Sequence, residues 1–217
     1  MPATTIDDRG PAVRARPLSQ ALGRAALAAA GWRVVGALPA DEPKYVVVVA
    51  PHTSNWDFLL GLAAMFAVGL RAHWLGKHTL FRGPLGTLLR RLGGEPVRRD
   101  TPEGAVGAAI ERFDAHAHYV LGLSPEGTRR RVARWRSGYH RIARGAGVPI
   151  VPVWLDYSRR EIGIGAPLWP GPDAADDGDR LRALYRSGMA RFPERYAERD
   201  DDAVAPPPVA AGPPNDR

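Results

Sequence analysis

Residues 45–57 read Tyr-Val-Val-Val-Val-Ala-Pro-His-Thr-Ser-Asn-Trp-Asp, and this stretch decides the fold. Four consecutive valines are typical of a strand that is buried on both faces of a parallel sheet. The thirteen uncharged residues 58–70 that follow predict a helix. The loop between them carries His52 and Asp57, and open α/β sheets build their sites at the carboxyl ends of strands. The stretch therefore predicts an α/β fold with a functional site at His52.

The spacing of His52 and Asp57 suits two roles. If Ser54 or Asn55 caps the helix, Asp57 lies in the first turn and can meet the imidazole. That contact would keep one ring nitrogen protonated and leave the other to take a proton from a substrate hydroxyl, and a histidine side chain titrates at roughly 6.5 when unperturbed. Alternatively, Asp57 serves only a capping box and His52 is a plain loop residue. The two roles are compatible, and both stay open.

The composition limits the class of protein. The 217 residues suit one sizeable α/β domain. The absence of cysteine excludes disulfides, thiolate metal sites and a cysteine nucleophile. The 30 Lys and Arg outnumber the 23 Asp and Glu, and only Lys44 and Lys77 are lysines. This excess of arginine indicates an anionic partner such as a phosphate ester, a membrane surface or nucleic acid, although a GC-rich genome also favours arginine.

Neither a membrane-spanning helix nor a signal peptide is predicted. The longest apolar run, 58–70, is shorter than the roughly 18 to 20 residues that a spanning helix needs. Asp7 and Asp8 lie early in the chain, and no basic region leads into an apolar core. We therefore expect a cytoplasmic or membrane-surface protein.

One domain is predicted between two disordered ends. Residues 1–16 are rich in Pro, Arg and Asp without periodicity, and residues 199–217 contain Asp and Pro runs. The domain spans 17–198 and begins with an amphipathic helix over 17–32, which could lie on a bilayer surface or, more commonly, dock on the core. The apolar positions of this helix are Leu18, Leu22, Ala25, Ala26, Ala29 and Trp32.

Strand and helix patterns alternate after residue 70. Strands are predicted over 72–76, 95–98, 118–123, 149–157 and 161–165. Helices are predicted over 84–92, 101–113, 137–144 and 179–191, with Thr101 as the cap of the second. Such alternation predicts a single mixed, mostly parallel sheet with helices on both faces.

A second candidate site, residues 124–129, also follows directly after a predicted strand and reads Ser-Pro-Glu-Gly-Thr-Arg. Gly127 would let a ligand approach the backbone closely, and Thr128 supplies a hydroxyl. Arg129 supplies a guanidinium fork suited to phosphate oxygens. Taken alone, these residues could equally form an ordinary strand-to-helix turn.

Four ordered blocks together resemble the glycerolipid acyltransferase family of PlsC type, which includes the lysophosphatidate acyltransferases. Two of them are H-x-x-x-x-D at residues 52–57 and P-E-G-T-R at residues 125–129. The third is 77–99, where a lysine precedes a Leu-Phe pair and a glycine-rich turn leads into a short strand that ends in arginine. The fourth is the proline-bearing strand at 147–153. The resemblance covers the motif-bearing core, 44–167.

The resemblance implies a glycerol-3-phosphate acyltransferase-like fold and a bacterial O-acyltransferase of phospholipid biosynthesis. The acyl group would pass from an acyl-CoA or acyl carrier protein thioester to a hydroxyl of a lysophospholipid acceptor such as 1-acylglycerol 3-phosphate. His52 would act as general base, and Asp57 would orient the imidazole. No cofactor or metal is implied beyond the thioester, which is a substrate.

The resemblance also implies roles for residues around the acceptor. Residues 127–129 would hold its phosphate, with Lys77 and Arg99 in the same cleft. Glu126 would bind an acceptor hydroxyl or brace Arg99 or Arg129 as an ion pair.

The expected partners are a lipid acceptor, an acyl thioester donor and the inner face of the cell membrane, where the protein would be peripheral. Acyl carrier protein is a further candidate. The run 58–70 could line a channel for the acyl chain or form plain core. Two rivals remain, an acyltransferase for another acceptor such as a lyso-ornithine lipid, and a non-catalytic basic membrane-binding module. Nucleic acid is not expected, because neither a basic recognition helix nor interleaved exposed aromatic residues stand out.

Overall fold

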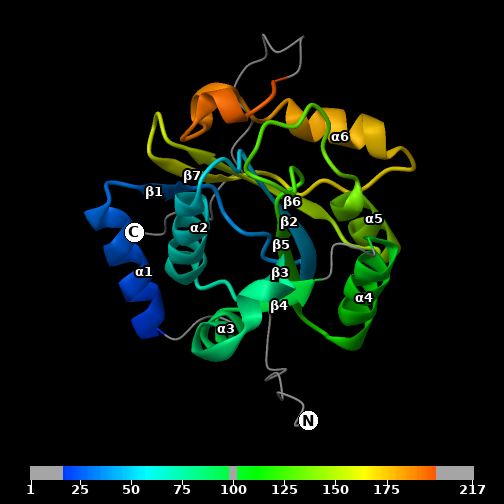
Figure 1. Cartoon of the computed structure of the whole chain (residues 1–217), viewed down its shortest axis with the longest axis horizontal. Helices are drawn as coiled ribbons and strands as arrows, with labels where there is room; N and C mark the ends of the chain where they lie inside the picture. Colours follow the sequence, from blue (N-terminus) through cyan, green and yellow to red (C-terminus); the bar gives the residue numbers. More distant parts are fainter. Residues whose placement is uncertain (1–16, 98–101, 199–217) are drawn as a thin grey trace.

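The computed structural model describes residues 17–97 and 102–198 (Figure 1). Its strands are β1 Arg33–Val35, β2 Lys44–Ala50, β3 His73–Lys77, β4 Gly94–Val97, β5 Tyr119–Leu123, β6 Ile150–Asp156 and β7 Glu161–Ile164. Its α-helices are α1 Pro17–Ala29, α2 Asn55–Val68, α3 Gly83–Arg91, α4 Pro102–Ala115, α5 Gly138–Gly145 and α6 Ala174–Arg182. Three short 3-10 helices complete the set, η1 His78–Phe81, η2 Ser187–Met189 and η3 Pro193–Arg195.

The strands form one sheet in the order β1-β7-β6-β2-β5-β3-β4. Neighbouring strands are parallel except for β6 and β7, which are antiparallel. Figure 1 shows α1 and α2 on one side of the sheet and α4 and α5 on the other. The predicted α/β domain with a mostly parallel sheet is therefore confirmed.

Strand β2 lies near the middle of the sheet, and its valines pack into the core on both faces, with Val49 half-buried and the other three buried. Val46 and Val48 pack against α4 and α5. Tyr45 and Val47 point the other way and pack with residues of α2. Because successive side chains of a strand alternate between faces, the four valines can only be buried if helices cover both sides. This confirms the reading of the valine run.

The last helix was predicted in the wrong place. Instead of spanning 179–191, α6 begins at Ala174, because the Asp173 side chain accepts a hydrogen bond from the Ala175 amide and caps it. The apolar residues that suggested a longer helix, Tyr185 and Met189 among them, lie in the turns that follow and pack on Trp154 and Ala50. Strand β1 was not predicted, because three residues carry no periodic signal.

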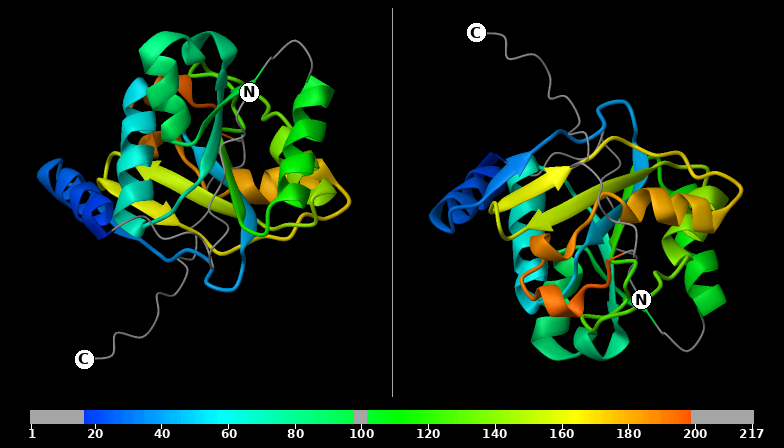
Figure 2. Two further views of the ribbon diagram at one scale, coloured as in Figure 1. Left: turned by 90° about the horizontal axis from the view of Figure 1, so that it is seen from below. Right: turned by 90° about the horizontal axis from the view of Figure 1, so that it is seen from above.

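Helix α1 confirms the first predicted helix, although the apolar positions do not all face the core. Gly23 and Leu27 are buried against α2, whereas Leu18 and Leu22 are 72% and 63% exposed. A Cβ atom at Gly23 would lie 2.5 Å from the backbone nitrogen of Ala67, so the glycine is what allows the two helices to approach. Both views of Figure 2 show α1 at the outer edge of the molecule, alongside α2.

Within the two described ranges, no helix is both long enough and apolar enough to cross a membrane. The predictions for residues 1–16 and 199–217 lie outside those ranges. So do Thr101, the predicted cap, and Arg99.

Candidate active site

Three neighbouring strands bring the candidate residues to one edge of the sheet. Val48 of β2 lies opposite Leu123 of β5, and Ala50 of β2 lies opposite Trp154 of β6. Both pairs are parallel, so the loop that carries His52 lies between the loop after β5 and the end of β6. This is the carboxyl edge at which open α/β sheets form their sites.

Ser54 and Asp57 form a capping box at the start of α2. The Ser54 hydroxyl accepts a hydrogen bond from the Trp56 amide at 3.2 Å, and Oδ2 of Asp57 accepts one from the Ser54 amide at 2.7 Å. The same oxygen accepts a 2.7 Å hydrogen bond from the Thr53 amide and lies 3.3 Å from Nδ1 of His52. The two roles considered for Asp57 thus coexist, because the cap holds the carboxylate beside the imidazole.

Asp57 is suited to remain ionised beside His52. Its side chain is only 1% exposed, and that burial by itself would raise the pKa. Hydrogen bonds from His52, from the Tyr157 hydroxyl and from the Ser54 amide outweigh burial and lower the pKa of Asp57 below its usual range. With Nδ1 directed at the carboxylate, Nε2 of His52 is the nitrogen left to accept a proton.

Among the described residues, Glu126 makes no ion pair with Arg129, whereas Arg99, the other arginine that it was predicted to brace, lies outside them. It is 2% exposed, and its Oε1 accepts a 2.8 Å hydrogen bond from the backbone amide of His52. Oε2 is buried without a hydrogen-bond partner among the described residues. Burial, with a further contribution from the charge of Asp57, raises the pKa of Glu126 to about 8 despite the hydrogen bond from His52. Glu126 therefore holds the backbone of the His52 loop through this hydrogen bond. Its carboxyl group is largely neutral at pH 7.

The residues predicted to bind phosphate line the same cleft as His52. They are Lys77 at the end of β3 and residues 127–129 after β5. Gly127 has a φ of 64°, a left-handed conformation that favours glycine. The Arg129 guanidinium donates a hydrogen bond to Oδ1 of Asn55, the first residue of α2. The two motifs are thus joined directly across the site, whereas Arg99 lies outside the described residues.

The cleft has a volume of about 1710 Å³ and extends along α2. Its polar wall contains His52, Lys77 and Arg129. Its apolar wall contains side chains from α2, β3, α3 and β5, including Phe58, Leu62, Met65, Trp74, Leu85, Leu89 and Leu123. One face of the apolar run 58–70 therefore lines a cleft, while Ala67 is buried away from it.

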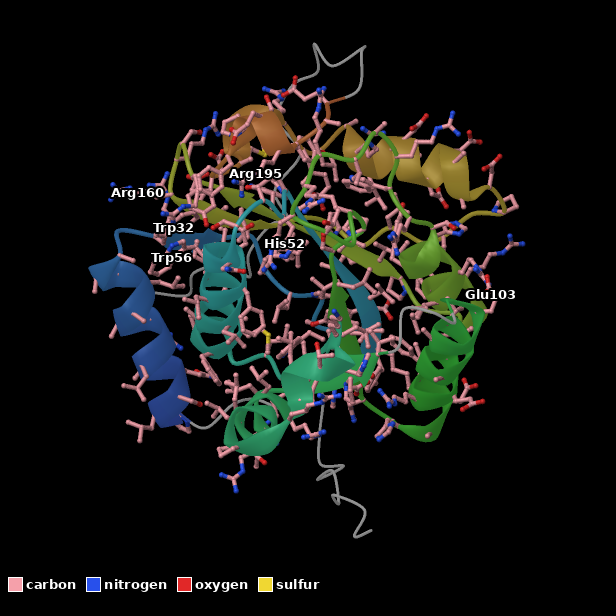
Figure 3. The ribbon with its side chains drawn as sticks, in the orientation of Figure 1. Trp32, His52, Trp56, Glu103, Arg160 and Arg195 are labelled. Carbon is pink, nitrogen blue, oxygen red and sulfur yellow. The ribbon has the colours of Figure 1, made fainter. Side chains whose placement is uncertain are left out.

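Two residues from the later part of the domain also contact the loop that carries His52, and the sequence did not reveal them. The Tyr157 hydroxyl donates a 2.7 Å hydrogen bond to Oδ1 of Asp57. The Arg195 guanidinium donates to the Thr53 carbonyl at 3.2 Å and lies close to His52 in Figure 3. Tyr157 could have been suspected, because it is the last residue of the strand predicted over 149–157, and that strand ends at the same edge of the sheet as the His52 loop. Arg195 belongs to no regular pattern in the sequence.

Among residues 17–97 and 102–198, no group of three or more His, Asp or Glu side chains could hold a metal ion.

The comparison with known families identifies the protein class. The model of the family described as Acyltransferase matches residues 33–156 of the 217. The chain belongs to the acyltransferase family. In this enzyme the matched region contains strands β1 to β6 and both motifs, residues 52–57 and 125–129.

Curated relatives of this acyltransferase include the 1-acyl-sn-glycerol-3-phosphate acyltransferases of Salmonella typhimurium and Escherichia coli. They are 25% and 24% identical to it over 192 residues, which cover 80% of this chain and 77% of theirs. The crystal structure of the 1-acyl-sn-glycerophosphate (LPA) acyltransferase, PlsC, from Thermotoga maritima is similar with a TM-score of 0.52 and 22% identity. That comparison covers 75% of this chain and 72% of the other. The predicted resemblance to PlsC-type acyltransferases and the predicted fold are confirmed.

Proposed function

We propose that this acyltransferase moves a fatty acyl group from a thioester, acyl-CoA or acyl carrier protein, to a hydroxyl of a lysophospholipid-type acceptor such as 1-acylglycerol 3-phosphate. The observation that carries the proposal is the His52–Asp57 pair on an apolar cleft that also contains Lys77 and Arg129. His52 can act as the base for the acceptor hydroxyl, Lys77 and Arg129 can bind the acceptor phosphate, and the apolar wall can hold the acyl chain. The names of the curated relatives point to the same acceptor.

In the proposed reaction, His52 acts as general base. Its Nε2 takes the proton of the acceptor hydroxyl as the hydroxyl oxygen attacks the thioester carbonyl carbon. Asp57 stabilises the imidazolium that forms. The C–S bond then breaks, and the departing thiolate takes the proton back from His52. The charge on His52 is therefore transient, which is why a fixed, ionised carboxylate on Nδ1 is useful.

Direct transfer needs no acyl-enzyme intermediate. The chain has no cysteine, and the hydroxyl of Ser54, the nearest serine in the motif, is occupied with the Trp56 amide. Ser54 is also only 5% exposed. An attack by the acceptor itself is therefore the simpler scheme.

The apolar wall suits the fatty acyl chain. Helix α2 runs from Asn55, beside Arg129, to Val68, a rise of about 20 Å at 1.5 Å per residue. Side chains along its length line the cleft. An extended acyl chain of ordinary length could follow this wall with its carbonyl carbon at His52.

The acceptor phosphate would bind between Lys77 and Arg129, with the hydroxyl of Thr128 and the backbone at Gly127 as further ligands. Asn55 accepts a hydrogen bond from Arg129 and so restrains the guanidinium at the start of α2. Arg99 stays in this proposal as a further cation supplied by the resemblance.

A peripheral position on the inner face of the cell membrane fits the exposed leucines. Leu59, Leu80 and Leu85 line the cleft and are 49% to 58% exposed. Leu18 and Leu22 of α1 and Leu88 of α3 are exposed as well. Arg82, between η1 and α3, and Arg90 and Arg91 of α3 are exposed near Leu80, Leu85 and Leu88 in sequence and would attract anionic lipid. The enzyme would then take its lipid acceptor from the bilayer.

The test is an acyl transfer assay. The purified protein is given labelled acyl-CoA or acyl carrier protein thioester and a panel of 1-acylglycerol 3-phosphate, other lysophospholipids, lyso-ornithine lipid and glycerol 3-phosphate. We expect ester formation with 1-acylglycerol 3-phosphate, and a loss of about a hundredfold or more in His52→Ala. The matched control is His116→Ala, a histidine on α4's C-terminal side whose Nδ1 contacts the Arg112 carbonyl, and it should keep wild-type activity.

The outcomes separate the candidates. Activity that survives His52→Ala would refute the general-base assignment. Preference for another hydroxylated lipid would change the acceptor but not the chemistry. An absence of transfer with either donor, together with binding to anionic vesicles, would favour a membrane-binding module.

A further inference from the structure

Tyr157 contacts the catalytic pair although it lies just beyond the region matched by the family, residues 33–156. It directly follows β6, whose Trp154 is level with Ala50 of β2. The two strands are parallel, so Tyr157 leaves the sheet at the same edge as the loop that carries His52. The hydroxyl reaches Oδ1 of Asp57 at 2.7 Å.

This hydrogen bond completes the environment of a buried carboxylate. Oδ2 of Asp57 already serves the amides of Thr53 and Ser54 and faces His52. Oδ1 points the other way, and Tyr157 is its hydrogen-bond donor. Without that donor, a charged oxygen with almost no solvent contact would be unsatisfied, which favours rotation or protonation of the carboxylate. Rotation would withdraw Oδ2 from Nδ1 of His52, and protonation would remove the negative charge beside it.

Tyr157 is itself held in place from several directions. Its backbone amide donates to the Met189 carbonyl at 2.8 Å. Its ring meets Trp32 edge-on, with centroids 4.9 Å apart. The Arg191 guanidinium lies 5.9 Å from the Tyr157 ring and 5.3 Å from that of Trp56. Figure 3 shows Trp32 and Trp56 at the same end of α2 as His52.

The phenol is also chemically suited to be a permanent donor. Burial, and then the hydrogen bond to Asp57 and the charge of Asp57, raise the pKa of Tyr157 far above its ordinary value. The hydroxyl therefore keeps its proton throughout the pH range in which an enzyme of this kind would work. Its ring is aligned by Trp32 and Arg191, so the direction of the donated bond is defined.

We propose that Tyr157 is a positioning residue for acyl transfer, which acts through Asp57 by holding the carboxylate so that Oδ2 faces Nδ1 of His52. Its effect on the reaction rests on the proposed function, whereas its effect on Asp57 does not. Tyr157 touches neither donor nor acceptor in this assignment. Its loss should therefore slow the chemical step and leave substrate binding unchanged.

The kinetic test compares Tyr157→Phe with Tyr119→Phe. Phenylalanine keeps the ring contacts with Trp32 and Arg191 and removes only the hydroxyl. Tyr119 is a matched control, because its hydroxyl also donates to a carboxylate, Oε1 of Glu95 at 3.1 Å, but it begins β5 at the opposite edge of the sheet. We expect kcat to fall by about ten- to hundredfold in Tyr157→Phe, with both KM values within about twofold, and no change in Tyr119→Phe. Equal kcat in the wild type and Tyr157→Phe would overturn the inference.

A double-mutant cycle with Asp57→Asn tests whether Tyr157 acts through Asp57. If it does, Tyr157→Phe costs little further activity once Asp57 has lost its charge. Losses that multiply in the double variant would instead indicate an independent structural role and would contradict the proposal.

A measurement without turnover separates this inference from the proposed function. The carboxyl carbons of aspartate are labelled with ¹³C, the Asp57 signal is assigned by its absence in Asp57→Asn, and its pH midpoint is followed by NMR. The midpoint should rise by on the order of one pH unit in Tyr157→Phe and stay unchanged in Tyr119→Phe. An unchanged midpoint in Tyr157→Phe refutes the positioning role. A raised midpoint in a protein that transfers no acyl group supports the contact and counts only against the proposed function.

Discussion

Replacing Glu126 with glutamine should make the free energy of unfolding less sensitive to pH. The Glu126 carboxyl is 2% exposed, and burial raises its pKa from an ordinary 4.5 to about 8. Between these two values the folded protein holds a proton that the unfolded chain releases. The free energy of unfolding therefore falls as the pH rises through this window. Glutamine has the same shape, keeps an oxygen for the His52 amide and carries no titrating proton.

The magnitude follows from the size of the shift. One unit of pKa corresponds to about 1.4 kcal/mol, so the full shift of Glu126 would amount to roughly 5 kcal/mol. Local relaxation and water entry on ionisation reduce this, and we expect about 2 to 3 kcal/mol. Glu126→Gln should match the wild type near pH 5 and exceed it by that amount above pH 8.

Urea unfolding, followed by tryptophan fluorescence at several pH values from 5 to 8.5, measures the difference directly. Glu103→Gln is the control, because the Glu103 side chain is 78% exposed and projects from α4 at the surface in Figure 3. Its difference from the wild type should be small and constant. A constant difference for Glu126→Gln as well would show that the buried carboxyl titrates normally, and the electrostatic account of Glu126 would then be wrong.

Two further predictions concern packing and the membrane. Gly23→Val should destabilise the protein by about 1 to 3 kcal/mol in urea unfolding, because its Cβ would meet the backbone of α2, whereas Gly61→Ala, with nothing within 4 Å of its Cβ, should not. Equal stability of the two variants would mean that α1 does not dock through Gly23. Leu85→Ser with Leu88→Ser should weaken binding to vesicles of anionic phospholipid by about tenfold or more, whereas Trp169→Ser, which removes another exposed apolar side chain, should leave it within about twofold. If the double leucine variant and Trp169→Ser lose vesicle binding equally, Leu85 and Leu88 do not form a specific membrane contact.

Short-range signals predicted the central part of the fold and the contact between His52 and Asp57. Four valines need burial on both faces, so they predicted a strand covered by helices whatever the rest of the chain did. The segment from Ser54 to Asp57 contains its own cap, and a cap acts within one helical turn. His52 and Asp57 are therefore brought together by local geometry. The same holds for the turn at Gly127.

The roles of Glu126, Tyr157 and α1 could not be predicted in this way. Glu126 was expected to bind an acceptor hydroxyl or to brace Arg99 or Arg129, and the hydrogen bond that it accepts from the His52 amide depends on the parallel pairing of β2 with β5. Tyr157 meets Asp57 because β6 lies next to β2, across 100 residues of sequence. The docking face of α1 depends on where α2 lies.

The sequence by itself thus determined which residues have chemistry to offer and which elements carry them. The sequence signals for helices and strands, which are the spacing of apolar residues and the capping residues, extend over only a few positions. The tertiary structure decided which carboxylate supports the base, which hydroxyl holds that carboxylate and which leucines stay exposed. Those choices depend on strand order and register, which are set by the packing of segments far apart in the chain.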